Sequence, residues 1–190
     1  MAKVTQGDII EAAARLFNQN GYHATSMQDV ARAVDIRKPS LYHHFESKES
    51  ILLAILEVGM DRLIAELAAI AATKQDCHSK LRAAIHAHAR AIASNPEAAS
   101  IFLREDRGLG DGYLVHHLSR RDQLEQIFRA IAQEGIDRRE FRLVDVPIAT
   151  QALLGMINWM TRWHKPHGRL SAEQVADIFA DLFLNGLLAK

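Results

Sequence analysis

The sequence has little cysteine, no net charge and no long apolar run. Its 190 residues include one cysteine, Cys77, which excludes an intrachain disulfide and favours a reducing compartment. Lysine and arginine number 23, as do aspartate and glutamate, so overall charge favours neither nucleic acid nor an acidic partner. No apolar run approaches the roughly 20 residues of a membrane-spanning helix, and the opening MAKVTQGD lacks a signal-peptide core. We therefore expect a cytoplasmic protein without a membrane partner.

Strand patterns are nearly absent, whereas helical spacing of apolar residues recurs along the chain. The apolar content of 48% is sufficient for a sizeable core. The expected helices cover residues around 9–20, 27–34, 39–45, 48–73, 79–94, 97–105, 113–133, 146–163 and 171–188. Asn20-Gly21 and Gly135 are expected to stop the first and seventh of these helices. The prediction is an all-α fold of about nine helices.

Residues 25–48 combine two short helical segments with a tight turn. The first segment has an apolar stripe at positions i, i+3, i+4 and i+7, formed by Met27, Val30, Ala31 and Val34. A capping box is available either from Thr25 with Gln28 or from Ser26 with Asp29. The segment therefore predicts a short helix with a defined start.

The second segment follows a turn at Asp35, a residue type that tolerates a left-handed backbone. Pro39 suits the first turn of a helix, where its missing N–H loses no partner. Leu41 and Phe45 lie four residues apart and are expected to pack inward. This order is typical of a helix-turn-helix, although two packed helices with an ordinary loop would give similar periodicity.

The remaining side chains of the second segment are hydrogen-bond donors. They are Arg37, Lys38, Ser40, Tyr42 and His43. Phosphates and base edges need such donors, and their position beside a helix start favours DNA binding. Residues 1–48 nevertheless contain six basic and five acidic residues, a difference of only +1 before histidine. DNA affinity must therefore come from local placement.

The order GYHATSMQDVARAV…KPSLYHHFESKESIL, within residues 8–57, resembles the N-terminal domain of the TetR family of transcriptional repressors. The resemblance implies a three-helix DNA-binding domain over residues 1–47 and an effector-binding and dimerisation domain over 48–190. Two positions depart from the family pattern. Asp35 stands where glycine is frequent, and Arg37 stands where a serine or threonine usually caps the third helix. The second change is expected to alter the operator sequence rather than abolish binding.

The same resemblance implies roles for individual residues at double-stranded operator DNA. Thr25 or Ser26, together with Tyr42 and Lys48, would contact phosphates. The residues expected near base edges are Arg37, Lys38, Pro39, Ser40 and His43. A core aromatic is the alternative interpretation of Tyr42. The family acts as a dimer on a palindrome, and the expected dimer-interface residues are Ile178, Phe179 and Leu182, which an internal core would explain almost as well.

The C-terminal stretch GMINWMTRWHKPHGRL and the run FLREDRGL resemble the branch of the family that senses acyl-CoA thioesters. The implied ligand contacts are Phe102, Arg104, Met156, Trp159, Met160, Arg162, Trp163 and Arg169. Apolar side chains would line the pocket, and cations with tryptophans would meet the nucleotide. Trp159 and Trp163 also suit a core or a dimer interface, and Arg104 also suits a surface ion pair. A regulator of efflux or detoxification genes with a drug-like ligand is the alternative.

Two other functional classes compete with a regulator. An enzyme is not expected, because no nucleophile–base pair, paired carboxylates or glycine-rich phosphate loop has convincing spacing. Ten histidines leave a metal-binding helical bundle as an alternative. His86 and His88 are poor co-ligands, however, because positions i and i+2 of a helix do not share a face. We therefore expect no metal site and no cofactor, with an acyl-CoA as the possible effector.

Overall fold

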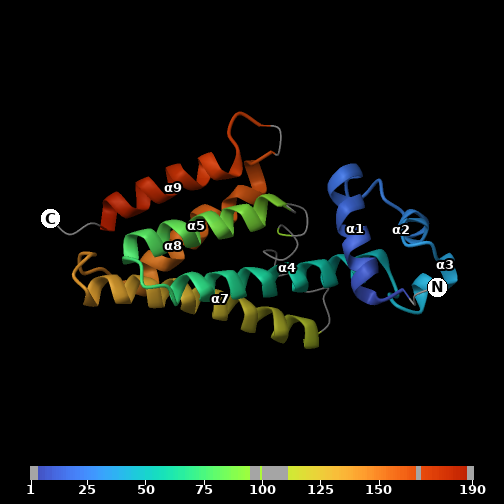
Figure 1. The fold of residues 1–190 in the computed structure, drawn as a ribbon, viewed down its shortest axis with the longest axis horizontal. Helices are drawn as coiled ribbons and strands as arrows, with labels where there is room; N and C mark the ends of the chain where they lie inside the picture. The colour runs from blue at the N-terminus through green and yellow to red at the C-terminus, as the bar shows by residue number, and fades with distance from the viewer. Residues whose placement is uncertain (1–3, 95–98, 100–110, 166–167, 188–190) are drawn as a thin grey trace. The chain divides into compact units, whose positions relative to one another are not determined.

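The computed structural model describes residues 4–94, 99, 111–165 and 168–187, and the side chains of 111–117 and 187 are outside that description. Eight helices form the described chain (Figure 1). They are α1 (Gln6–Asn20), α2 (Met27–Ala33), α3 (Lys38–Tyr42), α4 (Lys48–Ala71), α5 (Cys77–Ser94), α7 (Asp111–Asp137), α8 (Val146–Trp163) and α9 (Ala172–Leu187). The all-α prediction is confirmed. The helix expected over 97–105 lies outside the described residues.

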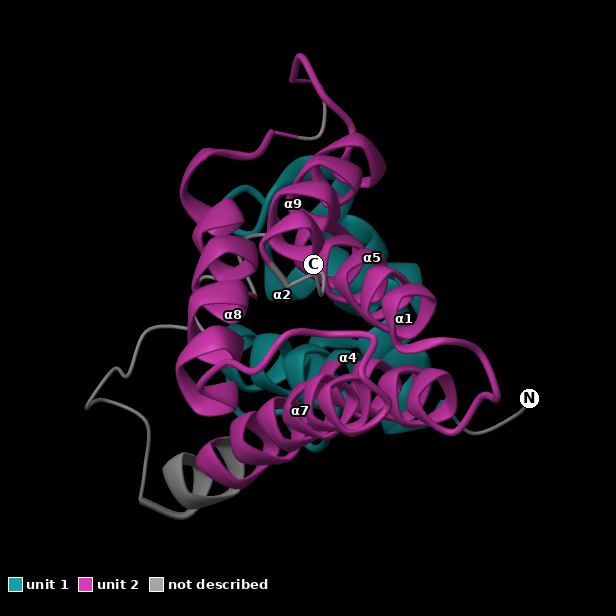
Figure 2. Ribbon diagram, turned by 90° about the vertical axis from the view of Figure 1, so that its left-hand side faces the viewer, with its two compact units in different colours: residues 1–59 teal, residues 60–190 magenta. Residues whose placement is uncertain are grey.

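The chain divides into two compact units, a head of residues 1–59 and a body of residues 60–190 (Figure 2). The division falls inside α4, so the first half of this helix belongs to the head and the second half to the body. The domain boundary expected from the sequence lies at residue 47, at the start of the same helix.

The capping residues of α1 determine where this first helix of the head begins and ends. Thr5 caps α1: its hydroxyl accepts from the Asp8 backbone N–H (3.2 Å), while the Asp8 carboxylate accepts from the Thr5 N–H (2.8 Å). These hydrogen bonds hold the pKa of Asp8 below its ordinary value. At the other end Gly21 has φ 84°, a left-handed conformation that glycine adopts without a Cβ penalty. The predicted stop at this glycine is confirmed.

The head has a small apolar core. Its members come from all four helices and are Ile9, Ala12, Ala13, Phe17, Met27, Val30, Ala31, Leu41, Phe45, Ile51, Leu52, Ile55 and Leu56. They follow the helical spacing seen in the sequence, since each short helix buries one stripe against its neighbours. Helices this short are marginal alone, and the shared core therefore stabilises α2 and α3.

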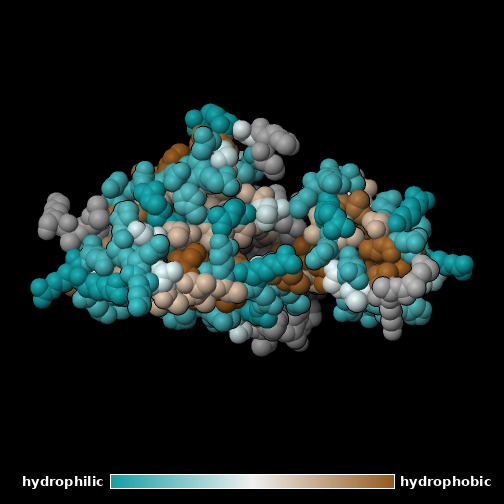
Figure 3. Space-filling model, in the orientation of Figure 1, coloured by the Kyte–Doolittle hydropathy of each residue, from teal (hydrophilic) through white to brown (hydrophobic). Residues whose placement is uncertain are grey.

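In the body, α5 packs against α7, α8 and α9. Leu81 and Ile85 of α5 meet a core that includes Phe128, Leu153 and Ile157. A capping box starts α9: the Ser171 hydroxyl accepts from the Gln174 N–H at 3.2 Å, and the Gln174 side-chain oxygen accepts from the Ser171 N–H at 2.9 Å. In the view of Figure 3, hydrophilic residues cover most of the surface drawn in colour. Within the described residues, no helix is both long enough and apolar enough to cross a bilayer.

One predicted helix end is wrong. Gly135 does not stop α7, which continues to Asp137. A Cβ at Gly135 would lie 2.2 Å from Cδ2 of Phe141. The glycine therefore allows the buried Phe141 ring to pack directly on the backbone of α7, a long-range requirement that helical spacing does not reveal.

Candidate nucleic-acid interface and ligand pocket

The turn between α1 and α2 separates the roles of its two hydroxyl residues. Ser26 caps α2: its hydroxyl accepts from the Asp29 N–H at 3.2 Å, and the Asp29 carboxylate accepts from the Ser26 N–H at 2.9 Å. Hydrogen bonds from Ser26 also lower the pKa of Asp29. Thr25 is only 2% exposed, and its hydroxyl donates to the Gly21 carbonyl at 2.9 Å. Of the two expected phosphate contacts, Ser26 is therefore the exposed one.

The turn between α2 and α3 has the conformation expected from its residues. Asp35 has φ 54°, the left-handed region that aspartate tolerates. Arg37 is the N-cap of α3 and makes no side-chain capping hydrogen bond, and Pro39 lies in the first turn. The family's usual cap is therefore absent, and the guanidinium of Arg37 is exposed beside the helix start.

Helix α3 has a buried side and an exposed side. Leu41 is fully buried and Phe45, just beyond the helix, is 8% exposed. The exposed residues at this helix are Arg37, Lys38, Pro39, Ser40, Tyr42 and His43. Tyr42 is 46% exposed, with the Lys38 ammonium 5.9 Å from its ring centroid, so the alternative of a core aromatic is wrong. Among the described residues, no ion pair reaches Arg37 or Lys38.

Lys48 is also expected to contact a phosphate, but its ammonium lies against the turn that precedes α2. Its ammonium donates to the Tyr22 carbonyl at 2.7 Å and to the Thr25 carbonyl at 2.9 Å. It also lies 4.3 Å from the centroid of the Tyr22 ring. The side chain is thus directed at the turn before α2, and two of its three donors are engaged within the head.

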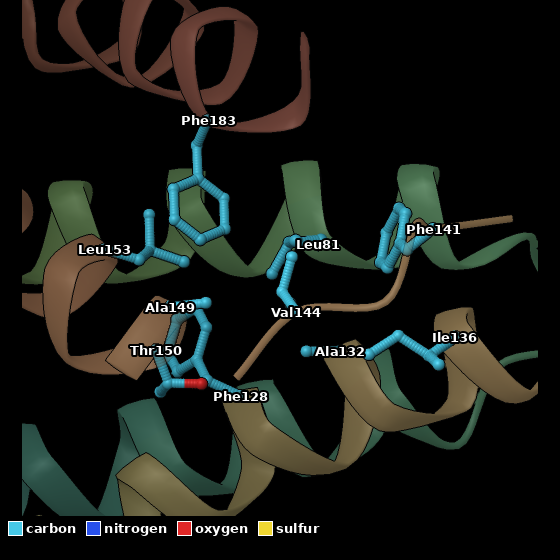
Figure 4. Close-up of a pocket in the computed structure, with 10 residues that line it drawn as sticks. All are labelled: Leu81, Phe128, Ala132, Ile136, Phe141, Val144, Ala149, Thr150, Leu153 and Phe183. Atoms are coloured by element: carbon cyan, nitrogen blue, oxygen red, sulfur yellow. The ribbon is translucent and has the colours of Figure 1, made fainter. Parts of the chain in front are cut away.

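The body contains a small apolar cavity of about 10 Å³ between α5, α7, α8 and α9 (Figure 4). Its lining residues are Leu81, Phe128, Ala132, Ile136, Phe141, Val144, Ala149, Thr150, Leu153 and Phe183. Phe183 and Phe128 approach it from opposite sides (Figure 4). Thr150, which is 2% exposed, supplies the only hydroxyl among the described lining residues. The cavity suits an apolar group with at most one hydrogen-bonding atom beside it.

Two family models match the chain. Residues 9–55 match "Bacterial regulatory proteins, tetR family", and residues 74–187 match "Tetracyclin repressor-like, C-terminal domain". The second match covers more than half of the chain. The chain belongs to the TetR family. It is therefore a DNA-binding transcriptional regulator, and the exposed side of α3 is its candidate DNA-reading surface.

Relatives within the TetR family support this assignment along the whole chain. The HTH-type transcriptional repressor KstR2 of Rhodococcus jostii (strain RHA1) is 30% identical over 95% of this chain and 89% of its own length. A TetR/AcrR-family regulator from Thermobifida fusca superposes with a TM-score of 0.82 at 34% identity, covering 95% and 97% of the two chains. AibR, solved with isovaleryl coenzyme A and operator DNA, has a TM-score of 0.72 at 29% identity, covering 93% and 96%.

None of the predicted ligand residues that the structure describes is among the residues that line the cavity. Phe102 and Arg104 lie outside the described residues. Trp159 and Trp163 are 63% and 44% exposed, and the Arg162 guanidinium lies 6.0 Å from the Trp159 ring centroid. The others are Met156, which is half-buried, Met160, which is in the core, and Arg169, which is exposed. The lining of the cavity was missed because its apolar helical spacing is the spacing of any core.

The predicted dimer-interface residues divide into two groups. Ile178 and Leu182 on α9 are 46% and 65% exposed. Phe179 is half-buried and meets Trp163 of α8 edge-on, with ring centroids 6.4 Å apart. The Trp163 and Phe179 rings therefore connect α8 to α9, while Trp159 of α8 and Ile178 and Leu182 of α9 are exposed.

The histidines of α5 have separate surroundings. His86 Nε2 lies 3.0 Å from the Asp177 carboxylate of α9, whereas His88 is 5% exposed and packs near Phe128. Burial lowers the pKa of His88 to about 4, so its imidazole is neutral near pH 7. In the described part of the chain, no three histidine, cysteine or acidic side chains gather as metal ligands would.

Proposed function

We propose that this TetR-family regulator binds a palindromic operator as a homodimer and is released by an acyl-CoA thioester. The observation that carries the DNA-binding part is the exposed side of α3. Arg37, Lys38 and Tyr42 are exposed, whereas Leu41 of the same segment is buried. Arg37 and Lys38 lie closest to the helix start and supply the direct readout, while Tyr42 contacts phosphate.

Dimerisation is supported by the exposed apolar side chains of α8 and α9. Trp159, Trp163, Ile178 and Leu182 are large apolar residues that a monomer would leave in water. Burying them against a second copy related by a two-fold axis removes this surface from water and places two copies of α3 on one duplex. An operator with two half-sites about one helical turn apart follows from that symmetry.

The effector is proposed to insert its acyl group into the apolar cavity. No cation is among the described lining residues, so the phosphates of a CoA must lie outside it. A cavity of about 10 Å³ holds roughly one water molecule, which is far smaller than a ligand pocket. Binding therefore requires the surrounding helices to separate, and an effector that prefers the expanded body shifts the population of DNA-competent dimers.

The test begins with an operator selected from random duplexes by the full chain. Light scattering should give a dimer, and the selected sequence should be a palindrome. A panel of thioesters, from isovaleryl-CoA to long-chain and steroid acyl-CoAs, is then added to the complex. At least one should release the labelled duplex and raise the melting temperature of the protein.

Two variants of α8 make the effector test specific. Ala149→Leu fills the cavity and should abolish release, because Ala149 lines it. Ala152→Leu makes the same change one turn away at an exposed position and should respond as the wild type does. A panel of thioesters that neither stabilises the protein nor releases DNA, together with release by an uncharged drug-like ligand, would favour the efflux-type alternative.

A further inference from the structure

The Lys48 ammonium is surrounded by groups of the head. A lysine ammonium has three N–H donors. Two of them point to the carbonyls of Tyr22 and Thr25, at 2.7 and 2.9 Å, and the Tyr22 ring lies 4.3 Å from the charge. A phosphate could reach only the third donor without displacing these partners. The arrangement instead joins the first residue of α4 to the turn between α1 and α2.

Hydrogen bonds and a ring contact also hold the turn between α1 and α2 in place. The Gly21 N–H donates to the Phe17 carbonyl at 2.9 Å, and the Thr25 hydroxyl donates to the Gly21 carbonyl at 2.9 Å. The Tyr22 ring meets Phe17 edge-on, with centroids 5.1 Å apart. The Lys48 charge also lies beside the C-terminal end of α1, where the helix dipole favours a cation. Lys48 is therefore one support of a rigid turn rather than a free side chain.

The turn leads directly into the helix-turn-helix. Thr25, whose carbonyl accepts from Lys48, immediately precedes Ser26, the N-cap of α2. The turn at Asp35 then connects α2 to α3. A shift of the first residue of α4 thus acts on the start of α2 through two charge-assisted hydrogen bonds, which are stronger than neutral ones.

We propose that Lys48 is a positioning residue that couples α4 to the helix-turn-helix, acting through the carbonyls of Tyr22 and Thr25 rather than through a phosphate. The inference rests on the operator binding proposed above. Helix α4 is continuous from Lys48 to Ala71, so its second half, in the body, is covalently connected to this support. An effector that moves α4 therefore shifts the start of α2 through the Lys48 side chain.

Salt dependence separates positioning from phosphate contact. Lys48→Met keeps the aliphatic stem and removes the donors, and Lys38→Met makes the same change at an exposed lysine of α3. Each lost phosphate contact lowers the slope of log K against log salt by about 0.9, hence about 1.8 for a dimer. We expect Lys48→Met to weaken operator binding about tenfold with the wild-type slope. Lys38→Met should reduce the slope, because it removes a cation from the exposed side of α3, whose charge would release counterions from the DNA even when the ammonium contacts a base edge.

Amide hydrogen exchange of the DNA-free full chain gives a second measurement. Exchange over residues 22–26 should be faster in Lys48→Met and unchanged in Lys38→Met, because only the former loses the hydrogen bonds to this turn. A Lys48→Met slope that falls as far as the Lys38→Met slope overturns the proposal. So does an unchanged exchange rate in the turn.

A third variant covers the case in which Lys48→Met does not fold. Tyr22→Leu keeps every cation and removes the ring beside Lys48. It should weaken operator binding without changing the salt slope, and it should speed amide exchange in the turn. A wild-type operator affinity together with a wild-type exchange rate would overturn the proposal. If the wild type selects no duplex at all, the proposed operator binding fails, whereas the exchange measurement on free protein still decides whether Lys48 holds the turn.

Discussion

The ion-paired cations of the body differ from the two cations at the start of α3 in the head. Six cations of the body are in ion pairs with carboxylates, namely Lys80, Arg82, Arg90, Arg120, Arg129 and Arg138. The head also has nearly equal numbers of basic and acidic residues, yet Arg37 and Lys38 have no carboxylate partner among the described residues. A net charge near zero therefore does not argue against DNA binding. What matters is which cations are already neutralised by the fold.

The paired Lys80 of the body and the cations of α3 also differ in burial. The Lys80 side chain is 2% exposed, and its ammonium donates to both carboxylate oxygens of Glu134, at 3.0 and 2.9 Å. These bonds hold the pKa of Glu134 below its ordinary value. The corresponding cations of α3 are exposed. Changes in the body should therefore alter stability, and changes on α3 should alter DNA affinity.

The largest effect should come from breaking the buried pair in the body. Glu134→Leu leaves the Lys80 ammonium buried without a counter-charge, which should lower the free energy of unfolding by about 3 kcal/mol. Glu134 is 31% exposed, so water reaching this side keeps the cost at the lower end of the range for buried pairs. Urea denaturation of the full chain measures it.

The matched control makes the same change in an exposed pair of the body. Glu66→Leu removes the partner of Arg90, whose side chain is 51% exposed, and should change the free energy of unfolding by about 0.5 kcal/mol. The double variant Lys80→Met with Glu134→Leu should recover most of the lost stability, because no buried charge remains. Equal losses at the two pairs would contradict the contrast between buried and exposed ion pairs.

The next effect concerns the buried imidazole of His88. Its Nδ1 has no hydrogen-bond partner among the described residues, and burial lowers its pKa to about 4 from an ordinary 6.5. The unfolded chain therefore takes up the proton first as the pH falls. The stability is complete above pH 6.5 and declines toward pH 4, with about 2 kcal/mol lost by pH 5. Urea denaturation at pH 7 and pH 5 measures this loss.

Replacing the imidazole tests the assignment of this pH dependence. His88→Leu should be near wild-type stability at pH 7, because it removes a buried nitrogen without a partner and keeps an apolar side chain there. At pH 5 the variant should be the more stable protein. A wild-type decline between pH 7 and pH 5 that persists in His88→Leu would assign the loss to other groups.

The head was predictable from the sequence because local contacts determine it. The Ser26–Asp29 cap, the left-handed Asp35 and the inward Leu41 all depend on residues within a few positions of one another. The same holds for the cap of α9 at Ser171. Such features follow from capping and helical spacing alone.

The features that were missed depend on contacts between distant residues. The packing of Phe141 on Gly135, the lining of the cavity from four helices, and the partners of Lys48 join segments that no local pattern connects. Thr25 and Ser26 are equivalent as caps in the sequence, and only the fold turns one hydroxyl inward. The roles of individual residues at DNA stay predictions.

A smaller effect is expected from the exposed arginine of the head. Arg37→Ala should weaken operator binding by about 1.5 kcal/mol and change the selected base at its position, with no measurable change in stability. The reason is that Arg37 makes no capping hydrogen bond and has no carboxylate partner in the described chain. Competition with single-base variants of the operator measures both changes. A lower melting temperature with unchanged base preference would make Arg37 a structural residue instead.

The smallest effect should be the loss of one hydroxyl at the surface of α3. Tyr42→Phe keeps the ring, which lies near the Lys38 ammonium, and removes only the phenol oxygen. If this hydroxyl donates to a phosphate, affinity should fall by about 1 kcal/mol for every duplex, specific or not, because phosphates are common to all sequences.

Ser40→Ala is the matched control, since it also removes one exposed hydroxyl of α3 but at a position expected near base edges. A loss that is equal for specific and nonspecific duplexes in Tyr42→Phe, and confined to the specific duplex in Ser40→Ala, would divide the exposed side of α3 into phosphate and base contacts. The reverse pattern would exchange the two roles.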